Sequence, residues 1–393
     1  MSQFPIGAGI TLADLEGDVH GVLHRLRAAE PVSWLRVLGG WLVTGYDHAV
    51  EVMRDAVTYT VDHPGFSTAR VVGPSMLSMD GAEHRRLRTP FEEPFRRKEV
   101  AARFEQTIAQ QADQLVDGFA AAGRAELRRD YAGPLAVHTM IDALGLDDVP
   151  VSTVLGWYDR IVDAITRLTA GQAVSPDGRA AFLSLREHLQ PALKAPPRSN
   201  LLAAASGRAD GLSDDEVLSN GAVLLFGGIE TTEGMIANAF YHLLTVPHLL
   251  QSARADASLL PALIEESLRM EPAAAVVDRY AVCNVRLGDV VIKSGDLVRV
   301  SLTGANRDPK IFVDPDRFDP HRANIRTHLA FAQGPHVCLG LHLARLEAQQ
   351  ALKSALTTLP DLRLVTGNDV MEQARPRGLV FRKSQALHVV WRD

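Results

Sequence analysis

Apolar residues recur three and four positions apart along much of the chain, which is the spacing of amphipathic helices. The pattern runs through residues 83–193 and resumes after residue 212. Between these stretches, Ala195-Pro196-Pro197 interrupts it and predicts a loop. A last helix is expected to begin near Leu341. These segments together predict a chain that is mainly α-helical.

Extended segments are fewer and shorter. Residues 282–300 alternate apolar and polar positions, with turns at Gly288-Asp289 and Gly295-Asp296, which predicts small antiparallel hairpins. Residues 41–44 and 378–391 are also expected to be extended. With no internal repeat or flexible linker, residues 1–393 are expected to form a single domain, mainly α with a small β component.

One helix is expected to be unusually long. Ser213 and Glu216 form an S-x-x-E capping box, and the helical pattern then continues to about Thr245. At 1.5 Å per residue this is roughly 50 Å, enough to cross the whole domain. Its middle reads Gly227-Gly228-Ile229-Glu230-Thr231-Thr232, in which the glycines and β-branched residues weaken the helix. A threonine there can bond back to the carbonyl four residues earlier and bend the helix. Tight packing against a crossing helix explains the glycines equally well.

The ten residues Phe331-Ala332-Gln333-Gly334-Pro335-His336-Val337-Cys338-Leu339-Gly340 carry the most specific signal. A turn at Gly334-Pro335 precedes Cys338, and a helix is expected to follow at once, so Cys338 lies at a helix N-terminus, where a thiolate is stabilised. An anionic sulfur there suits an iron porphyrin. A buried free cysteine and a nucleophile paired with His336 are the alternatives. Cys283, in a short apolar strand, is expected to be a small core residue.

Composition narrows the classes of function. The net charge of −6 argues against nucleic-acid binding, and the longest apolar run is too short for a membrane span. The start of the chain has no secretory pattern, so a soluble, cytoplasmic protein is expected. Two cysteines cannot hold an iron–sulfur cluster, and no dinucleotide fingerprint is evident.

Four motifs in order resemble those of the cytochrome P450 family. The cysteine loop fits F-x-x-G-x-H/R-x-C-x-G, and the middle of the long helix fits G-G-x-E-T-T. Glu266 and Arg269 fit E-x-x-R, on a helix expected over residues 258–270, and residues 318–322 resemble the arginine-bearing loop that follows. The resemblance covers essentially the whole chain. It implies the cytochrome P450 fold and haem b, iron protoporphyrin IX, as the cofactor.

The resemblance also implies roles for individual residues. Cys338 is the expected axial ligand of the iron. The residues expected to bind or contact the haem are His84, Arg88, Gly227, Arg279, Phe331, His336, Cys338 and Gly340. His84 and Arg88 also fit a basic, solvated helix face. A buried ion network is expected to order the cysteine loop, formed by Glu266, Arg269 and Arg322, with Arg317 as the other candidate.

By resemblance, the reaction is oxygen insertion into a small, mostly apolar substrate. Thr231 is expected to hydrogen-bond the oxygen and Glu230 to relay protons from solvent. The pocket is expected to be lined by residues 66–79, 274–277 and 379–381 and the helix near Leu224, and residues 61–80 look short for a lid. The individual pocket residues are Val71, Leu77, Leu224, Gly228, Val276, Val277 and Val380.

The chain has no means of obtaining electrons from a nucleotide, so a ferredoxin or flavodoxin with its reductase is the expected partner. Docking is expected on the cysteine side of the haem, at the basic residues Arg96, Arg97, Lys98 and Arg345. Three alternatives remain open: a haem sensor or carrier without turnover, a peroxide-driven haem-thiolate enzyme, and a cysteine hydrolase without haem. The Glu230–Thr231 pair favours turnover, because binding alone needs no proton relay.

Overall fold

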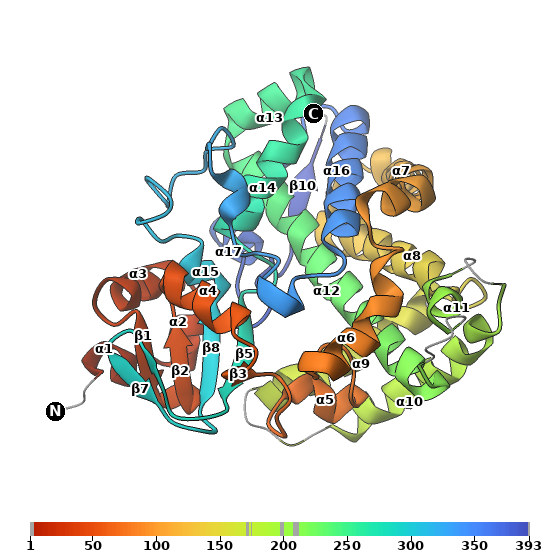
Figure 1. The fold of residues 1–393 in the computed structure, drawn as a ribbon. Coiled ribbons are helices and arrows are strands. Elements are labelled where there is room, and N and C mark those ends of the chain that lie inside the picture. Colours follow the sequence, from red (N-terminus) through yellow and green to blue (C-terminus); the bar gives the residue numbers. More distant parts are fainter. Residues whose placement is uncertain (1–3, 170–172, 174, 197–199, 207–211, 392–393) are drawn as a thin grey trace.

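Helices dominate the fold. The computed structural model describes residues 4–169, 173, 175–196, 200–206 and 212–391. Most of the helices gather on one side of the molecule, and the larger sheet lies on the other with the helices of residues 5–54 beside it (Figure 1). Within the described residues, no helix is both long and apolar enough to cross a membrane. In chain order the α-helices are α1 (Pro5–Gly9), α2 (Leu12–Glu16), α3 (His20–Ala29), α4 (Tyr46–Arg54), α5 (Ser67–Val72), α6 (Gly81–Glu92), α7 (Arg97–Ala120), α8 (Gly133–Leu144), α9 (Val151–Thr169), α10 (Pro176–Leu193), α11 (Leu201–Ser206), α12 (Asp214–Thr245), α13 (Pro247–Ala255), α14 (Leu260–Met270), α15 (Leu302–Ala305), α16 (Leu341–Thr358) and α17 (Asn368–Ala374).

The strands form one five-stranded sheet and two smaller ones. The larger sheet has the order β1-β2-β8-β5-β3, in which only β2 and β8 run parallel. The strands are β1 (Val32–Leu35), β2 (Gly40–Val43), β3 (Tyr59–Thr60), β4 (Arg124–Glu126), β5 (Val276–Ala281), β6 (Val285–Leu287), β7 (Val290–Ile292), β8 (Leu297–Ser301), β9 (Arg363–Leu364) and β10 (His388–Val390). Of the predicted hairpins in residues 282–300, the one at Gly288-Asp289 is confirmed as the β6–β7 pair. The turn at Gly295-Asp296 leads instead into β8, which pairs with β2 and β5 and not with β7.

Helix α12 passes through the middle of the helical region (Figure 1). The capping box is confirmed, since the Ser213 side chain accepts from the Glu216 amide and the Glu216 side chain accepts from the Ser213 amide. Helices α8, α10, α14 and α16 all pack against it. Because it is covered on so many sides, even its polar residues are mostly buried, which an amphipathic surface helix would not show.

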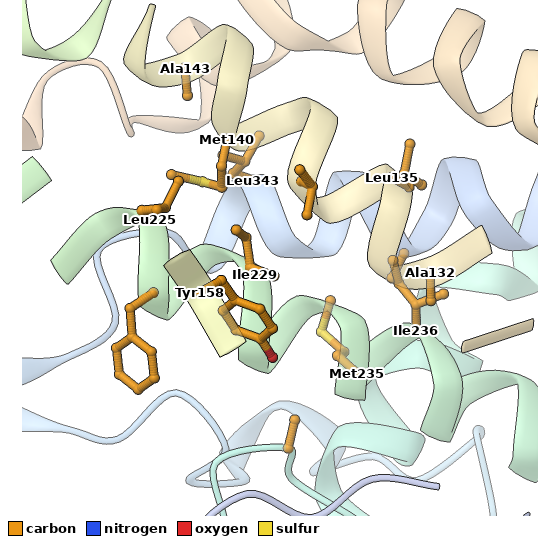
Figure 2. Packing of buried hydrophobic residues seen from close by; sticks show 14 of the residues in the cluster. Ala132, Leu135, Met140, Ala143, Tyr158, Leu225, Ile229, Met235, Ile236 and Leu343 are labelled. Atoms are coloured by element: carbon orange, nitrogen blue, oxygen red, sulfur yellow. The ribbon is translucent and has the colours of Figure 1, made fainter. Parts of the chain in front are cut away.

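Apolar side chains fill the contact between α8, α12 and α16. Figure 2 shows Met140 of α8, Ile229 of α12 and Leu343 of α16 gathered here, all nearly or fully buried. Each such burial stabilises the fold by about 1.5–3 kcal/mol. Gly228 is part of this contact, because a Cβ atom on it would lie 2.3 Å from the Met140 sulfur. Close packing of α12 against α8 therefore explains why residue 228 is glycine.

Three predictions need correction. Cys283 is exposed rather than in the core, because β5 ends at Ala281 and Cys283 lies in the turn that leads to β6. Residues 378–391 were expected to be extended, but only β10 and the isolated bridges at Phe381 and Lys383 are. Most of this segment has no strand beside it. The helix expected over residues 258–270 begins as a 3₁₀ turn and becomes α-helical only at Leu260. In the Ala195-Pro196-Pro197 loop, residue 197 lies outside the described residues.

Candidate active site

The cysteine loop turns sharply and presents Cys338 just before α16. The Cys338 amide donates to the Phe331 carbonyl at 2.9 Å, and Gly340 is the N-cap residue of α16. Gly334 has φ +75°, and a Cβ atom on it would lie 2.5 Å from the Met53 carbonyl, so the turn requires glycine. Burial raises the pKa of the Cys338 thiol, whereas a hydrogen bond from the Gly340 amide and the charges of Arg88 and Arg345 lower it. The loop thus supplies a sulfur ligand with donors around it.

Ala332 lies in the same loop with φ +56°, in the left-handed region that disfavours a Cβ atom. Replacing Ala332 by glycine should therefore raise the free energy of unfolding by about 0.5–1 kcal/mol, measured by urea denaturation. The matched control is Ala330→Gly in the same loop. Ala330 is buried and has no left-handed conformation, so this change should lower the free energy of unfolding by about 1 kcal/mol. Destabilisation by Ala332→Gly would show that the left-handed conformation carries no strain.

A cavity of about 270 Å³, here called the inner cavity, lies between α12 and the cysteine loop. Apolar side chains make up most of its wall, including Phe226, Phe95 and Leu343. Among the predicted site residues, those that line it are Leu77, Arg88, Leu224, Gly227, Gly228, Thr231, Val277, Phe331, His336, Cys338 and Gly340. One apolar space thus brings together the sulfur of Cys338, the glycine pair of α12 and several predicted pocket residues.

Four basic side chains cluster near one margin of this cavity. The His84 and His336 rings lie 4.3 Å apart, and His336 Nε2 lies 2.8 Å from the Asp80 carboxylate. Arg88 donates to the Val337 carbonyl at 2.8 Å. Burial, with neighbouring positive charge, lowers the pKa of His84 to about 4. His84 Nε2 and Arg279 Nη2 are buried without a hydrogen-bond partner among the described residues.

Such unpaired buried donors are costly and call for an acceptor. The cluster therefore suits an anionic group, and the two propionates of an iron porphyrin have that chemistry. The apolar wall and the Cys338 sulfur suit its flat ring and its iron. The residues present thus fit haem.

Across the inner cavity, α12 presents the bare backbone of Gly227 and the hydroxyl of Thr231, while the helix itself stays continuous. Thr231 Oγ1 donates to the Gly227 carbonyl at 2.7 Å, which confirms the predicted bond to the fourth preceding residue. A Cβ atom on Gly227 would meet nothing within 4 Å, so this glycine leaves open space. Gly227 and Gly228 therefore have different roles, one leaving room beside the cavity and the other permitting helix packing.

Glu230 faces away from the inner cavity. It lies on a second cavity of about 540 Å³, here called the outer cavity, which is bordered by α9, β5, β8, the β1–β2 turn and residues 378–381. Lys383 Nζ lies 2.8 Å from the Glu230 carboxylate, and the Tyr158 hydroxyl donates to it. Burial raises the pKa of Glu230, although Lys383 opposes the shift. Lys383 also pairs with Glu233, which accepts a bond from Arg128 at 3.0 Å. The Glu230 carboxyl and the Thr231 hydroxyl, which were predicted to act together, thus lie on opposite sides of one helix turn.

A buried ion network joins α14 to the loop before the cysteine. Arg269 donates twice to the Glu266 carboxylate at 2.8 Å, and both side chains are fully buried. Arg322 Nε donates to the same carboxylate at 2.9 Å, as does the Asp319 amide at 2.8 Å. The Arg317 side chain, the other candidate for this position, is 71% exposed and contributes only its carbonyl. Arg322 therefore contacts Glu266 and Arg317 does not.

Several predicted residues lie elsewhere. Val71 is in the main core, Val276 borders a small cavity beside α2 and α3, and Val380 lines the outer cavity. Arg345, expected at the docking surface, donates to Glu265 and lies over the Phe331 ring at 4.4 Å. These positions differ from the expectation because residues close in sequence point to different sides of a strand or turn.

Sequence reasoning also missed three side chains near the site. Glu347 is buried on the wall of the inner cavity, where burial raises the pKa of its carboxyl. Its place on α16, nine residues after Cys338, was readable from the helical period. Tyr158 and Lys383, which bind Glu230, have no local sequence signal that points to this role.

Comparisons with known proteins agree with this geometry. The family model described as "Cytochrome P450" matches residues 183–388, which include α12, the α14 ion pair and the cysteine loop. This chain belongs to the cytochrome P450 family. Cytochrome P450 107B1 of Saccharopolyspora erythraea is 34% identical over 90% of each chain. The cytochrome P450 monooxygenase PikC of Streptomyces venezuelae is 33% identical over 96% of this chain and 92% of its own.

Solved cytochrome P450 structures share the fold over nearly the whole chain. P450BioI in complex with hexadec-9Z-enoic acid ligated acyl carrier protein matches with a TM-score of 0.85 and 28% identity, over 95% of this chain and 98% of that one. The myxobacterial CYP267B1 in complex with myristic acid matches with a TM-score of 0.85 and 28% identity, over 97% of this chain and 98% of that one. This cytochrome P450 is a haem-dependent oxidoreductase of the monooxygenase class, with the mainly α fold predicted for it.

Proposed function

We propose that this cytochrome P450 inserts one oxygen atom from O2 into a mostly apolar organic substrate bound in the inner cavity, with Cys338 as the axial ligand of its haem. One observation carries the proposal. The Cys338 sulfur, the apolar wall and His336 all border a single cavity, and the orphaned nitrogens of His84 and Arg279 lie close to His336. When bound there, haem supplies the oxygen chemistry, with the thiolate donating electron density to the iron.

The direct test is the absorption spectrum of the purified protein, reduced with dithionite under carbon monoxide. A strongly red-shifted Soret band is the expected result, because that band reports thiolate ligation. A spectrum of the histidine-ligated type would overturn the assignment of Cys338. Pigment-free protein from cells supplied with a haem precursor would instead favour a cysteine hydrolase.

Around this site, the chain's own residues have separate tasks. His84, Arg88, Arg279 and His336 would hold the propionates, and Phe331 would pack beside the sulfur and shield it from water. Thr231 presents its hydroxyl at the inner cavity, where it holds a proton ready for the reacting oxygen. Glu230, raised in pKa by burial, supplies protons from the outer side of the helix turn. To do so its carboxyl must leave Lys383 and Tyr158 and turn toward Thr231.

Replacing Thr231 by alanine should cut the fraction of consumed electrons that appear in product by about 100-fold, which is the lower end of the effect of a positioned proton donor. The measurement compares product formed with NAD(P)H consumed under a surrogate redox system. Thr231→Ser is the matched control, since it keeps the hydroxyl and should retain most of the coupling. Unchanged coupling in Thr231→Ala would show that the relay assigned to Thr231 and Glu230 is wrong.

The electron donor we propose is a ferredoxin or flavodoxin with its reductase. Arg96, Arg97 and Lys98 are exposed at the start of α7, and they offer a basic surface to an acidic partner. Arg345 contributes less to this surface, because Glu265 already binds its guanidinium. A soluble, cytoplasmic location stays a prediction from the sequence.

A further inference from the structure

The inner and outer cavities are separated by a single layer of protein. Along β5, Val277 lines the inner cavity and its neighbour Asp278 lines the outer one, as expected for successive residues of a strand. Along α12, Thr231 lines the inner cavity and Glu230 the outer one. The outer cavity therefore lies directly behind the wall of the substrate site.

Two aromatic rings also meet between the cavities. Phe226 lines the inner cavity and Phe381 the outer one, and their ring centroids lie 5.6 Å apart in an edge-to-face arrangement. At this point the two cavities face each other across side chains. Side chains can change rotamer without breaking a helix or a strand, so this contact is the place where the cavities can join.

The outer cavity differs from the inner one in chemistry. Tyr280 borders it, and burial raises the pKa of its hydroxyl to about 12, so the group is neutral and can both donate and accept. Its ring stacks on His63 with centroids 3.8 Å apart, which fixes its orientation. The hydroxyl makes no hydrogen bond to any residue that the structure describes. A Cβ atom on Gly65 would lie 2.7 Å from it, so the hydroxyl's position depends on that glycine.

Charge in the outer cavity favours a ligand that donates hydrogen bonds. Arg299 is the basic residue of its lining, and it donates through two nitrogens to Asp278 at 2.7 Å each. The other charged residues of the lining, Glu16 and Glu230, are acidic. Arg70 is close enough to act on Tyr280 electrostatically, but it does not line the cavity. Because Lys383 already pairs with Glu230 and Arg299 with Asp278, the described lining of this cavity offers no unpaired cation to a carboxylate, whereas a hydroxyl finds acceptors in Tyr280 and Asp278.

We propose that the outer cavity is a second compartment of the substrate site and binds the hydroxyl end of an elongated aliphatic substrate. The apolar remainder passes between Phe226 and Phe381 and places its far end in the inner cavity. This inference rests on the proposed function and refines it, because a compact molecule would leave the outer compartment unused. Tyr280 is the specificity residue in this arrangement.

The test is a set of binding titrations on the haem-loaded protein with three matched ligand series of rising chain length. The series are 1-alkanols, the methyl ethers of those alkanols, and alkanoates. Calorimetry measures binding directly, and the haem spin-state change reports whether the ligand reaches the iron. Affinity should rise roughly fourfold per methylene in the alkanols. Beyond the length that reaches Tyr280, an alkanol should bind about tenfold more tightly than its ether or its alkanoate.

Two variants test the role of the Tyr280 hydroxyl while leaving the outer cavity in place. Tyr280→Phe deletes it, and Gly65→Ala displaces it, so each should reduce the preference for a long alkanol over its ether to near unity. Tyr241→Phe is the matched control, because Tyr241 lies near the end of α12 and lines neither cavity. That variant should keep the full preference.

Three outcomes would overturn the inference: equal binding of alkanol and ether at every length, tighter binding of the alkanoate, or a preference that survives in both Tyr280→Phe and Gly65→Ala. Failure of the proposed function has a different signature. In that case calorimetry would show the alkanol preference, while the reduced carbon monoxide complex would lack the red-shifted band.

Discussion

Cys338→His should abolish the red-shifted Soret band of the reduced carbon monoxide complex and lower product formation by at least about 100-fold. A factor of 100 corresponds to about 2.7 kcal/mol in the barrier, and loss of electron donation from the thiolate is the physical reason. An imidazole still binds iron, so haem content should fall much less than activity. The measurement pairs the carbon monoxide spectrum with turnover under a surrogate redox system.

The chain offers a matched control, because Cys283 is its other cysteine and is exposed in the turn after β5. Cys283→Ser should leave the spectrum and the rate unchanged. If Cys338→His kept the red-shifted band, another residue would have to be the ligand. The mechanism argued from the cysteine loop would then fail with it.

Arg269→Met should lower the free energy of unfolding by about 3–5 kcal/mol, because it leaves the carboxylate of Glu266 buried with only part of its partners. Both side chains of the pair have no exposed surface. The same change frees the carbonyls of Asn306, Pro315 and Arg317, which accept bonds from Arg269. Urea denaturation followed by circular dichroism measures the effect, and haem retention should fall in parallel if the network orders the cysteine loop as expected from the sequence.

Arg86→Met is the control for this prediction. Arg86 and Glu83 have the same three-residue spacing on α6, but their side chains are 38% and 49% exposed, and Glu216, the second partner of Arg86, is 31% exposed. The change in the free energy of unfolding should therefore be far smaller. Equal effects of the two substitutions would contradict the argument from burial. They would imply that the Glu266–Arg269 pair contributes no more to the free energy of unfolding than an ion pair on the surface does.

Much of the fold followed from the sequence because its signals are local. The capping box at Ser213, the alternation before β8 and the glycine turn before Cys338 each involve a few neighbouring residues, and each was confirmed. The back-bond of Thr231 was predictable for the same reason, because it joins residues of one helix turn. Backbone geometry over such short stretches depends little on the rest of the chain.

The burial of Cys283 was predicted wrongly because apolar character alone does not say whether a neighbouring element covers a side chain. The strand in question ends at Ala281, and no sequence pattern marked that end. Arg322 was favoured over Arg317 only through the resemblance to the family, because nothing in the local sequence separates the two. Both lie in the same loop, and only its path brings Arg322 to Glu266.

The sequence by itself determined the class of chemistry, since one cysteine in a tight glycine loop before a helix, with three further motifs in order, suffices to predict a haem-thiolate protein. The tertiary structure alone decided what surrounds that chemistry. It placed Lys383 and Tyr158 on Glu230 and put two cavities on opposite sides of one helix turn. The physical reason is that such contacts join residues far apart in the chain, so packing sets them and local sequence does not.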